Sequence, residues 1–198
     1  SPALILRSGV STLANAANVP PNITAGETFF ASTGAASGNS IGVGAISTAG
    51  GPVILQSGGD IGLDAIATSG GSITLQAASD IAVTGNLQST GGNIDITAGN
   101  LITVSGTFID SSGLNVSISS ANGSNGGAIA IRHAGGTTTP FIIGDATTNG
   151  TAGAIRSGSE TILPQLAVSC LFEASPVSVI HTGDGRRLRG AAGRQWQR

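Results

Sequence analysis

The strongest constraint in this sequence is a repeated unit in which two glycines and one variable residue precede a pair of aliphatic residues separated by one position. The four copies are Gly50-Gly51-Pro52-Val53-Ile54-Leu55, Gly70-Gly71-Ser72-Ile73-Thr74-Leu75, Gly91-Gly92-Asn93-Ile94-Asp95-Ile96 and Gly126-Gly127-Ala128-Ile129-Ala130-Ile131. The first three copies begin at positions 50, 70 and 91, so their spacing is nearly constant. A short, constant period of this kind is typical of a protein whose structural units stack on one another.

Two further apolar registers run in phase with this repeat. One consists of Ser40-Ile41-Gly42-Val43, Asp60-Ile61-Gly62-Leu63, Asp80-Ile81-Ala82-Val83 and Asn100-Leu101-Ile102-Thr103-Val104, and the other of Ile46, Ile66, Leu87 and Phe108. Alternation inside each segment places its aliphatic residues on one face, as in a short β-strand. Three short strands per coil of about 20–21 residues predict an all-β fold, a parallel β-helix or β-solenoid, most clearly from Ile41 to Ile131.

The alternative interpretation is an antiparallel β-sandwich. Sandwiches also contain short strands separated by glycine-rich turns, at intervals of about 8–12 residues. A sandwich, however, provides no reason for three registers to keep the same period. In a β-helix the period is required, because a strand of three or four residues is stable only when it pairs with the same segment of the next coil.

The composition indicates a folded chain with few charges. Hydrophobic residues make up 39% of the 198 residues and charged residues 9%, whereas disordered chains combine low hydrophobicity with high net charge. A single cysteine, Cys170, excludes an internal disulfide. No apolar run is long enough to span a bilayer, and we interpret the chain as an internal fragment of a longer protein.

The sequence divides into three parts. Residues 1–40 are expected to form irregular leading coils and a loop, and residues 41–165 the regular β-helix. Residues 166–198 form an atypical tail with five arginines after position 185, which we expect to be disordered. The basic part of the tail carries a single aromatic residue, Trp196, and no groove-reading motif, so no nucleic-acid partner is predicted.

Few residues suggest chemistry. Asp60 and Asp80 occupy equivalent positions in successive coils, between Ser40 and Asn100, and are a weak candidate for a metal site or an acid pair. We favour a structural role, because Asp and Asn before a strand commonly accept hydrogen bonds from turn N–H groups.

His133 has no companion ligands nearby in sequence, and we expect it in a surface loop. No catalytic residue, cofactor or metal is predicted, and the chain is not expected to be an enzyme.

One ladder of hydroxyl groups offers a further hypothesis. Thr48, Thr68 and Ser89 each precede a Gly-Gly pair by two residues. If they pointed outward, they could match an ice or other flat lattice. Otherwise they would only solvate a corner of the coil.

Several segments resemble the repeat regions of filamentous-haemagglutinin-like exoproteins of two-partner secretion, most closely the cyanobacterial type, some of which carry a CHAT domain elsewhere. The resemblance spans Leu4 to Leu163 and rests on the Gly-Gly copies, on Leu6-Arg7-Ser8-Gly9, on Ile129-Ala130-Ile131-Arg132-His133-Ala134-Gly135-Gly136 and on Thr139-Pro140-Phe141-Ile142-Ile143-Gly144-Asp145 with Asn149-Gly150-Thr151-Ala152-Gly153-Ala154-Ile155.

This resemblance implies a right-handed β-helix in a secreted or cell-surface protein. It also implies an outer-membrane secretion partner and a structural or adhesive role toward glycans, cell surfaces or extracellular matrix. The export module of the family is not recognisable here, and the basic tail departs from its pattern. The alternative function is a carbohydrate-active β-helix enzyme of the polysaccharide lyase or hydrolase type, since such enzymes share this fold.

Overall fold

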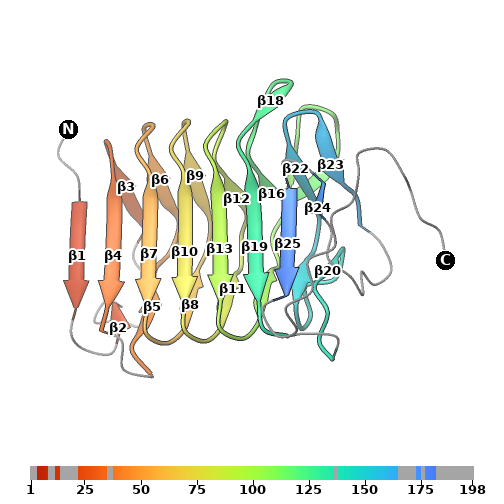
Figure 1. Cartoon of the computed structure of the whole chain (residues 1–198). Helices are drawn as coiled ribbons and strands as arrows, with labels where there is room; N and C mark the ends of the chain where they lie inside the picture. The colour runs from red at the N-terminus through yellow and green to blue at the C-terminus, as the bar shows by residue number, and fades with distance from the viewer. Residues whose placement is uncertain are drawn as a thin grey trace.

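The computed structural model describes residues 4–8, 12–13, 22–34, 38–135, 138–164, 173–174 and 177–181, and within these residues every regular element is a β-strand. The chain winds around one axis through three sheets, in which the strands of the regular coils pair in parallel (Figure 1). The chain descends along the front sheet, returns upward behind it and advances from left to right, which is a right-handed winding. The predicted right-handed parallel β-helix is therefore confirmed.

Each regular coil contributes one strand to each sheet. Sheet A contains, in spatial order, β1 (Leu4–Ser8), β4 (Phe29–Thr33), β7 (Val53–Ser57), β10 (Ile73–Ala77), β13 (Ile94–Ala98), β19 (Ile129–His133), β25 (Val177–His181) and β24 (Glu173–Ala174). Sheet B contains β2 (Thr12–Leu13), β5 (Ser40–Gly42), β8 (Ile61–Leu63), β11 (Ile81–Val83), β14 (Ile102–Val104), β21 (Gly150–Thr151) and β20 (Ile142–Ile143). Sheet C contains β3 (Ile23–Ala25), β6 (Ile46–Thr48), β9 (Ile66–Thr68), β12 (Leu87–Gln88), β16 (Asn115–Ser119), β22 (Ala154–Ser157) and β23 (Glu160–Ile162), with β15 (Phe108–Ile109) beside β16.

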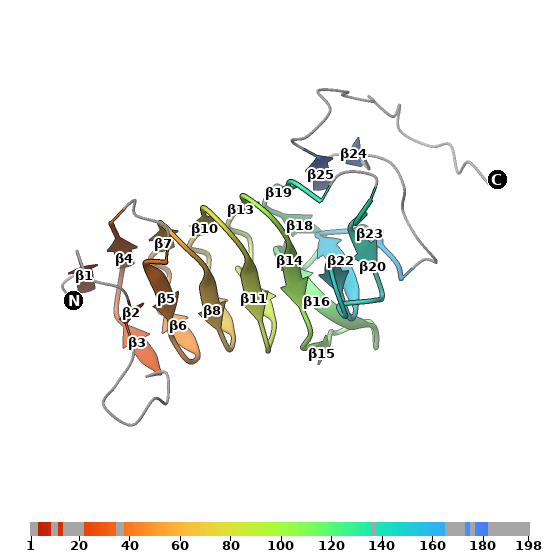
Figure 2. The ribbon, with the colours of Figure 1, turned by 90° about the horizontal axis from the view of Figure 1, so that it is seen from below.

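The strands stack in the register that the repeat predicts. Ile81 of β11 lies beside Ile61 of β8 in a parallel pair, and the backbone N–H of Ile61 donates to the carbonyl of Asp80 at 2.9 Å. Figure 2 shows β5, β8, β11 and β14 side by side from below. This parallel pairing excludes the antiparallel sandwich.

Aliphatic side chains from all three sheets fill the interior. Leu75 of sheet A, Ile81 of sheet B and Ile66 of sheet C are all fully buried, and the equivalent residues of the coils above and below continue the same columns. Burying one such side chain contributes about 1.5–3 kcal/mol. Because each coil shares its core with its neighbours, stability depends on stacking.

The Gly-Gly corners have two separate requirements. In the first three copies the first glycine adopts a left-handed backbone, with φ of +104° at Gly70, which disfavours any residue with a Cβ. The second glycine is needed for close approach, because a Cβ on Gly71 would lie 2.1 Å from the carbonyl oxygen of Gly51 one coil away. The first glycine of these pairs thus forms the turn, whereas the second permits the coils to stack.

Sheet A extends beyond the range predicted for the regular coils. β4 pairs in parallel with β7 and β1 with β4, so regular pairing begins before residue 41. At the other end, β24 and β25 lie inside the segment 166–198 that was expected to be disordered, and β25 pairs in parallel with β19. The alternating Val177, Val179 pattern explains this additional strand. The remainder of the predicted tail, including its arginines, lies outside the described residues.

The third apolar register departs from the prediction in the fourth coil. Leu87 of β12 pairs with Ile118 of β16, and not with Phe108 as the spacing suggested. Phe108 instead lies in β15, which runs antiparallel to β16. The fourth coil is longer than the others, with its Gly-Gly pairs at 91 and 126, and the additional residues displace Phe108 from the core.

Candidate functional site

The predicted Asp60 and Asp80 ladder hydrogen-bonds to the backbone. Asp60 Oδ1 accepts the N–H of Asp80 at 3.1 Å, and Asp80 Oδ1 accepts the N–H of Leu101 at 2.9 Å and the side-chain amide of Asn100 at 2.8 Å. Each carboxylate thus joins its coil to the next one. Within the described residues, no group of three or more His, Cys, Asp or Glu side chains could hold a metal ion.

The hydroxyl ladder points into the protein, so the lattice-binding hypothesis is wrong for these residues. Thr48, Thr68 and Ser89 are buried, with 3%, 2% and 0% of their surfaces exposed. Each hydroxyl donates to the carbonyl of the second glycine three residues later, as in the 2.6 Å bond from Thr48 to Gly51. This hydrogen bond satisfies a carbonyl that the turn removes from the sheet ladder.

His133 is fully buried, so its predicted place in a surface loop is wrong. It is the last inward-facing residue of β19, two positions beyond Ile131, and its ring packs on Phe141 with centroids 5.7 Å apart. Its Nδ1 accepts the backbone N–H of Gly135 at 3.1 Å and lies 3.1 Å from Asn149 Nδ2. Continuing the alternation of Ile129 and Ile131 by two positions leads to this inward position, which the expectation of a surface loop did not take into account.

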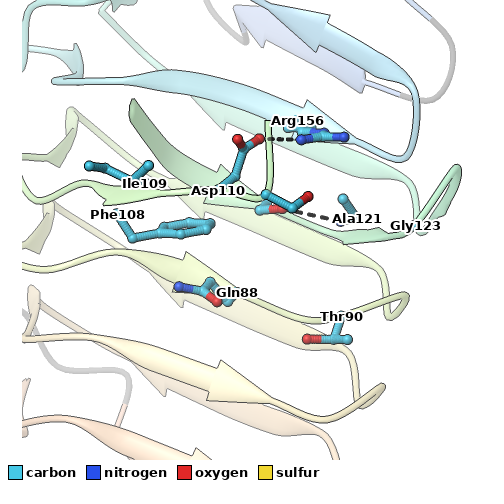
Figure 3. A pocket seen from close by; sticks show the side chains of 10 residues that line it. Gln88, Thr90, Phe108, Ile109, Asp110, Ala121, Gly123 and Arg156 are labelled. Carbon is cyan, nitrogen blue, oxygen red and sulfur yellow. Dashed lines mark hydrogen bonds and ion pairs between the residues drawn. The ribbon is translucent and has the colours of Figure 1, made fainter. Parts of the chain in front are cut away.

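One hollow among the described residues lies on the outer face of sheet C, where the fourth coil is enlarged. One extra segment, residues 105–114 with β15, precedes β16. A second, the antiparallel hairpin of β17 (Ala121–Asn122) and β18 (Asn125–Gly126), follows β16. Together they border a groove of about 320 Å³, which we call the sheet C groove (Figure 3).

Consecutive outward-facing positions of sheet C form the floor of this groove. Gln88 of β12 lies beside Ser119 of β16, which lies beside Arg156 of β22. In the regular coils the same column carries the small side chains of Ser47 and Ala67. The longer polar side chains therefore appear only where the two extra segments rise above the sheet.

The wall on the β15 side is held in place by Asp110. Its Oδ1 accepts the N–H of Ser112 at 2.8 Å, the hydroxyl of Ser112 at 2.7 Å and the N–H of Leu114 at 3.0 Å. Its Oδ2 forms an ion pair with Arg156 on the groove floor (Figure 3). The Asp110 side chain is only 7% exposed and the Arg156 side chain 17%.

These contacts stabilise the charged form of Asp110. Burial by itself would raise the pKa of the carboxyl, but hydrogen bonds from Ser112, Arg156 and Leu114 outweigh burial and hold that pKa well below its usual range. Arg156 is fixed in turn, since its Nε donates to the carbonyl of Gly158 at 3.0 Å. The wall and the floor are therefore joined by an ion pair whose carboxylate is charged at neutral pH.

This groove was not predicted. The spacing of the third apolar register placed Phe108 in the core, and no pattern in the sequence pointed to Gln88, Asp110 or Arg156. One signal was present, since the Gly-Gly pairs at 50, 70 and 91 are almost evenly spaced but the next pair begins only at 126. In a stacked fold, residues in excess of one coil must leave the coil, and they concentrate where function is found.

Comparisons with known proteins identified no relative of this chain. No family model matches the chain, and searches of curated proteins and of solved structures likewise found no match. Among the described residues no helix could cross a membrane.

Proposed function

We propose that this chain is a structural and adhesive segment of a large secreted surface protein, which presents a rigid, sparsely charged surface to glycans, cell surfaces or extracellular matrix. The sheet C groove is the observation that carries this proposal. It is a hollow lined by side chains with hydrogen-bonding groups, and the same outward column of sheet C carries the small side chains of Ser47 and Ala67 in the regular coils.

The outer face of sheet A supports the same role. Sheet A presents Gln56, Gln76 and Thr97 as neighbours in one outward column, with Arg132 next to them. Arg132 forms an ion pair with Asp95 at 2.6 Å, so this charge is locally balanced. The resemblance to filamentous-haemagglutinin-like exoproteins supports export through an outer-membrane partner.

A catalytic role in carbohydrate cleavage has less support. Most glycosidases use two carboxyl groups, one of which donates a proton. Asp110 is the only carboxylate among the described residues that line the groove, and its low pKa makes it a poor proton donor at neutral pH.

The test is adhesion of the whole chain. Beads coated with the purified chain are applied to a printed glycan array, to matrix proteins and to cells, with heat-denatured chain as the control. We expect retention on at least one glycan or matrix surface, whereas retention on none would contradict the proposal.

Turnover is measured in parallel as release of reducing ends or unsaturated products from soluble polysaccharides. We expect none. Turnover that disappears in Asp60→Asn/Asp80→Asn or in Asp110→Asn would establish the enzyme alternative instead.

A further inference from the structure

We infer that the sheet C groove is a binding site for a neutral oligosaccharide. This inference rests on the proposed adhesive function and specifies the site and the ligand class. The groove volume of about 320 Å³ lies at the lower end of the roughly 300–1,000 Å³ of small-molecule sites, which suits a few sugar rings entering from an open side.

The polar groups of the groove match sugar hydroxyls. The Gln88 side-chain amide donates one proton to Asn86 Oδ1 at 3.0 Å, which orients it and leaves its oxygen and second proton for a ligand. Thr90 and Ser111 add hydroxyl groups that can donate or accept at the rim of the groove. This mixture of donors and acceptors suits the hydroxyl groups of a sugar, because each hydroxyl both donates and accepts hydrogen bonds.

Phe108 supplies an apolar surface beside these polar groups. In the view of Figure 3 its ring projects between Gln88 and the Asp110–Arg156 pair, while the neighbouring Ile109 points away from them. The face of an aromatic ring is electron-rich and attracts the weakly positive C–H groups of a sugar ring. The aromatic ring can therefore contact the C–H groups of a saccharide while the neighbouring polar side chains bind its hydroxyl groups.

The charge balance favours a neutral saccharide over an acidic one. Arg156 is the only cation among the described residues that line the groove, and Asp110 neutralises it within the groove itself. An anionic sugar would have to displace Asp110 from Arg156 or lie beside its carboxylate. A neutral hydroxyl can hydrogen-bond to the edge of the ion pair without breaking it.

The groove is also ordered before any ligand arrives. Three hydrogen bonds to Asp110 from Ser112 and Leu114 fix the loop that carries Phe108, and the ion pair with Arg156 ties that loop to β22. A site that is already in its binding conformation loses less conformational entropy on binding.

The test is an NMR titration of the isotope-labelled whole chain with cellopentaose, maltopentaose, laminaripentaose, xylopentaose and mannopentaose, and separately with trigalacturonate and a heparin pentasaccharide. We expect at least one neutral probe to shift the backbone amide signals of Gln88, Ser111 and Gly123, with weaker or no shifts from the acidic probes. Gln88→Ala and Phe108→Leu should each lower the affinity about three- to tenfold. Gln76→Ala, on the exposed face of sheet A, is the matched control and should bind as the wild type does.

Three results would overturn the inference: no shifts with any neutral probe, stronger binding of the acidic probes, or affinities unchanged in both groove variants. If any of these occurs while the coated beads still adhere, only the placement or class of the ligand is wrong. If the beads also fail to adhere, the adhesive function itself is wrong.

Discussion

The side-chain oxygen of Asn149 accepts the backbone N–H of Ile102 at 3.0 Å, although the two residues are 47 positions apart in the chain. In the earlier coils the equivalent N–H groups donate to a backbone carbonyl of the next coil, as Ile81 does to Leu101. Asn149 also donates to the carbonyl of Thr139 at 2.8 Å, and it is only 2% exposed. Its side chain thus continues sheet B at the point where the regular repeat ends.

We therefore predict that Asn149→Ala lowers the free energy of unfolding by about 3 kcal/mol, because it leaves more than one buried polar group without its partner. Denaturation in urea, followed by circular dichroism, measures this loss. Asn125→Ala, at an exposed position of β18, is the control and should change stability by less than about 0.5 kcal/mol. Equal effects of the two substitutions would contradict the role given to Asn149.

The Gly-Gly corners yield a second prediction. Alanine substitutions at two adjacent glycines should lower the stability for different reasons. Gly70→Ala should cost about 1–2 kcal/mol, since its φ of +104° is unfavourable for alanine although space is available. Gly71→Ala should cost about 3 kcal/mol or more, because its Cβ would meet the Gly51 carbonyl oxygen at 2.1 Å. Thermal unfolding of both variants measures the order of these losses.

Gly62→Ala is the matched control for this pair. A Cβ at Gly62 would meet only the carbonyl oxygen of Ile41, at 4.0 Å, and Ala82 already occupies the equivalent position in the next coil. We expect its stability to stay within about 0.5 kcal/mol of the wild type. A Gly71 variant as stable as the Gly62 variant would show that the coils can separate at the corner.

The sequence predicted the regular part of this fold because one short pattern is sufficient to define a coil. It could not assign the fourth coil, where Phe108 stands one regular period after Leu87 but Ile118, further along the chain, takes the core position. Spacing alone favours Phe108, and only the pairing of whole strands shows that the intervening residues leave the coil. The role of Asn149 in sheet B could not be predicted for a related reason, because a hydrogen bond between a side chain and a distant backbone group has no local sequence pattern.

The buried hydroxyl ladder yields a third prediction. Thr68→Val keeps the size of the side chain but leaves the Gly71 carbonyl without the hydroxyl that donates to it, and should cost about 1–3 kcal/mol. Thr68→Ser should be tolerated within about 1 kcal/mol, because Ser89 and Ser120 make the equivalent bonds to Gly92 and Gly127. Urea denaturation of the two variants separates loss of the hydroxyl from loss of the methyl group. A valine variant no less stable than the serine variant would remove the structural role of the ladder.

The ion pair between Asp110 and Arg156 predicts a specific dependence of stability on pH. Because the pKa of Asp110 is lower in the folded chain than its usual value of about 4, the charged carboxylate stabilises the fold, and this contribution is complete above about pH 5. As the pH falls below about 4, the unfolded chain takes up a proton first and the contribution is progressively lost.

Asp110→Asn should therefore reduce the free energy of unfolding by about 1–2 kcal/mol at pH 7, with the difference from the wild type shrinking steadily toward pH 2. Asp64→Asn is the control, since Asp64 is exposed and, in the described part of the chain, forms no ion pair. A difference between the wild type and Asp110→Asn that stays constant down to pH 2 would mean that the charge of Asp110 does not hold the groove wall to its floor.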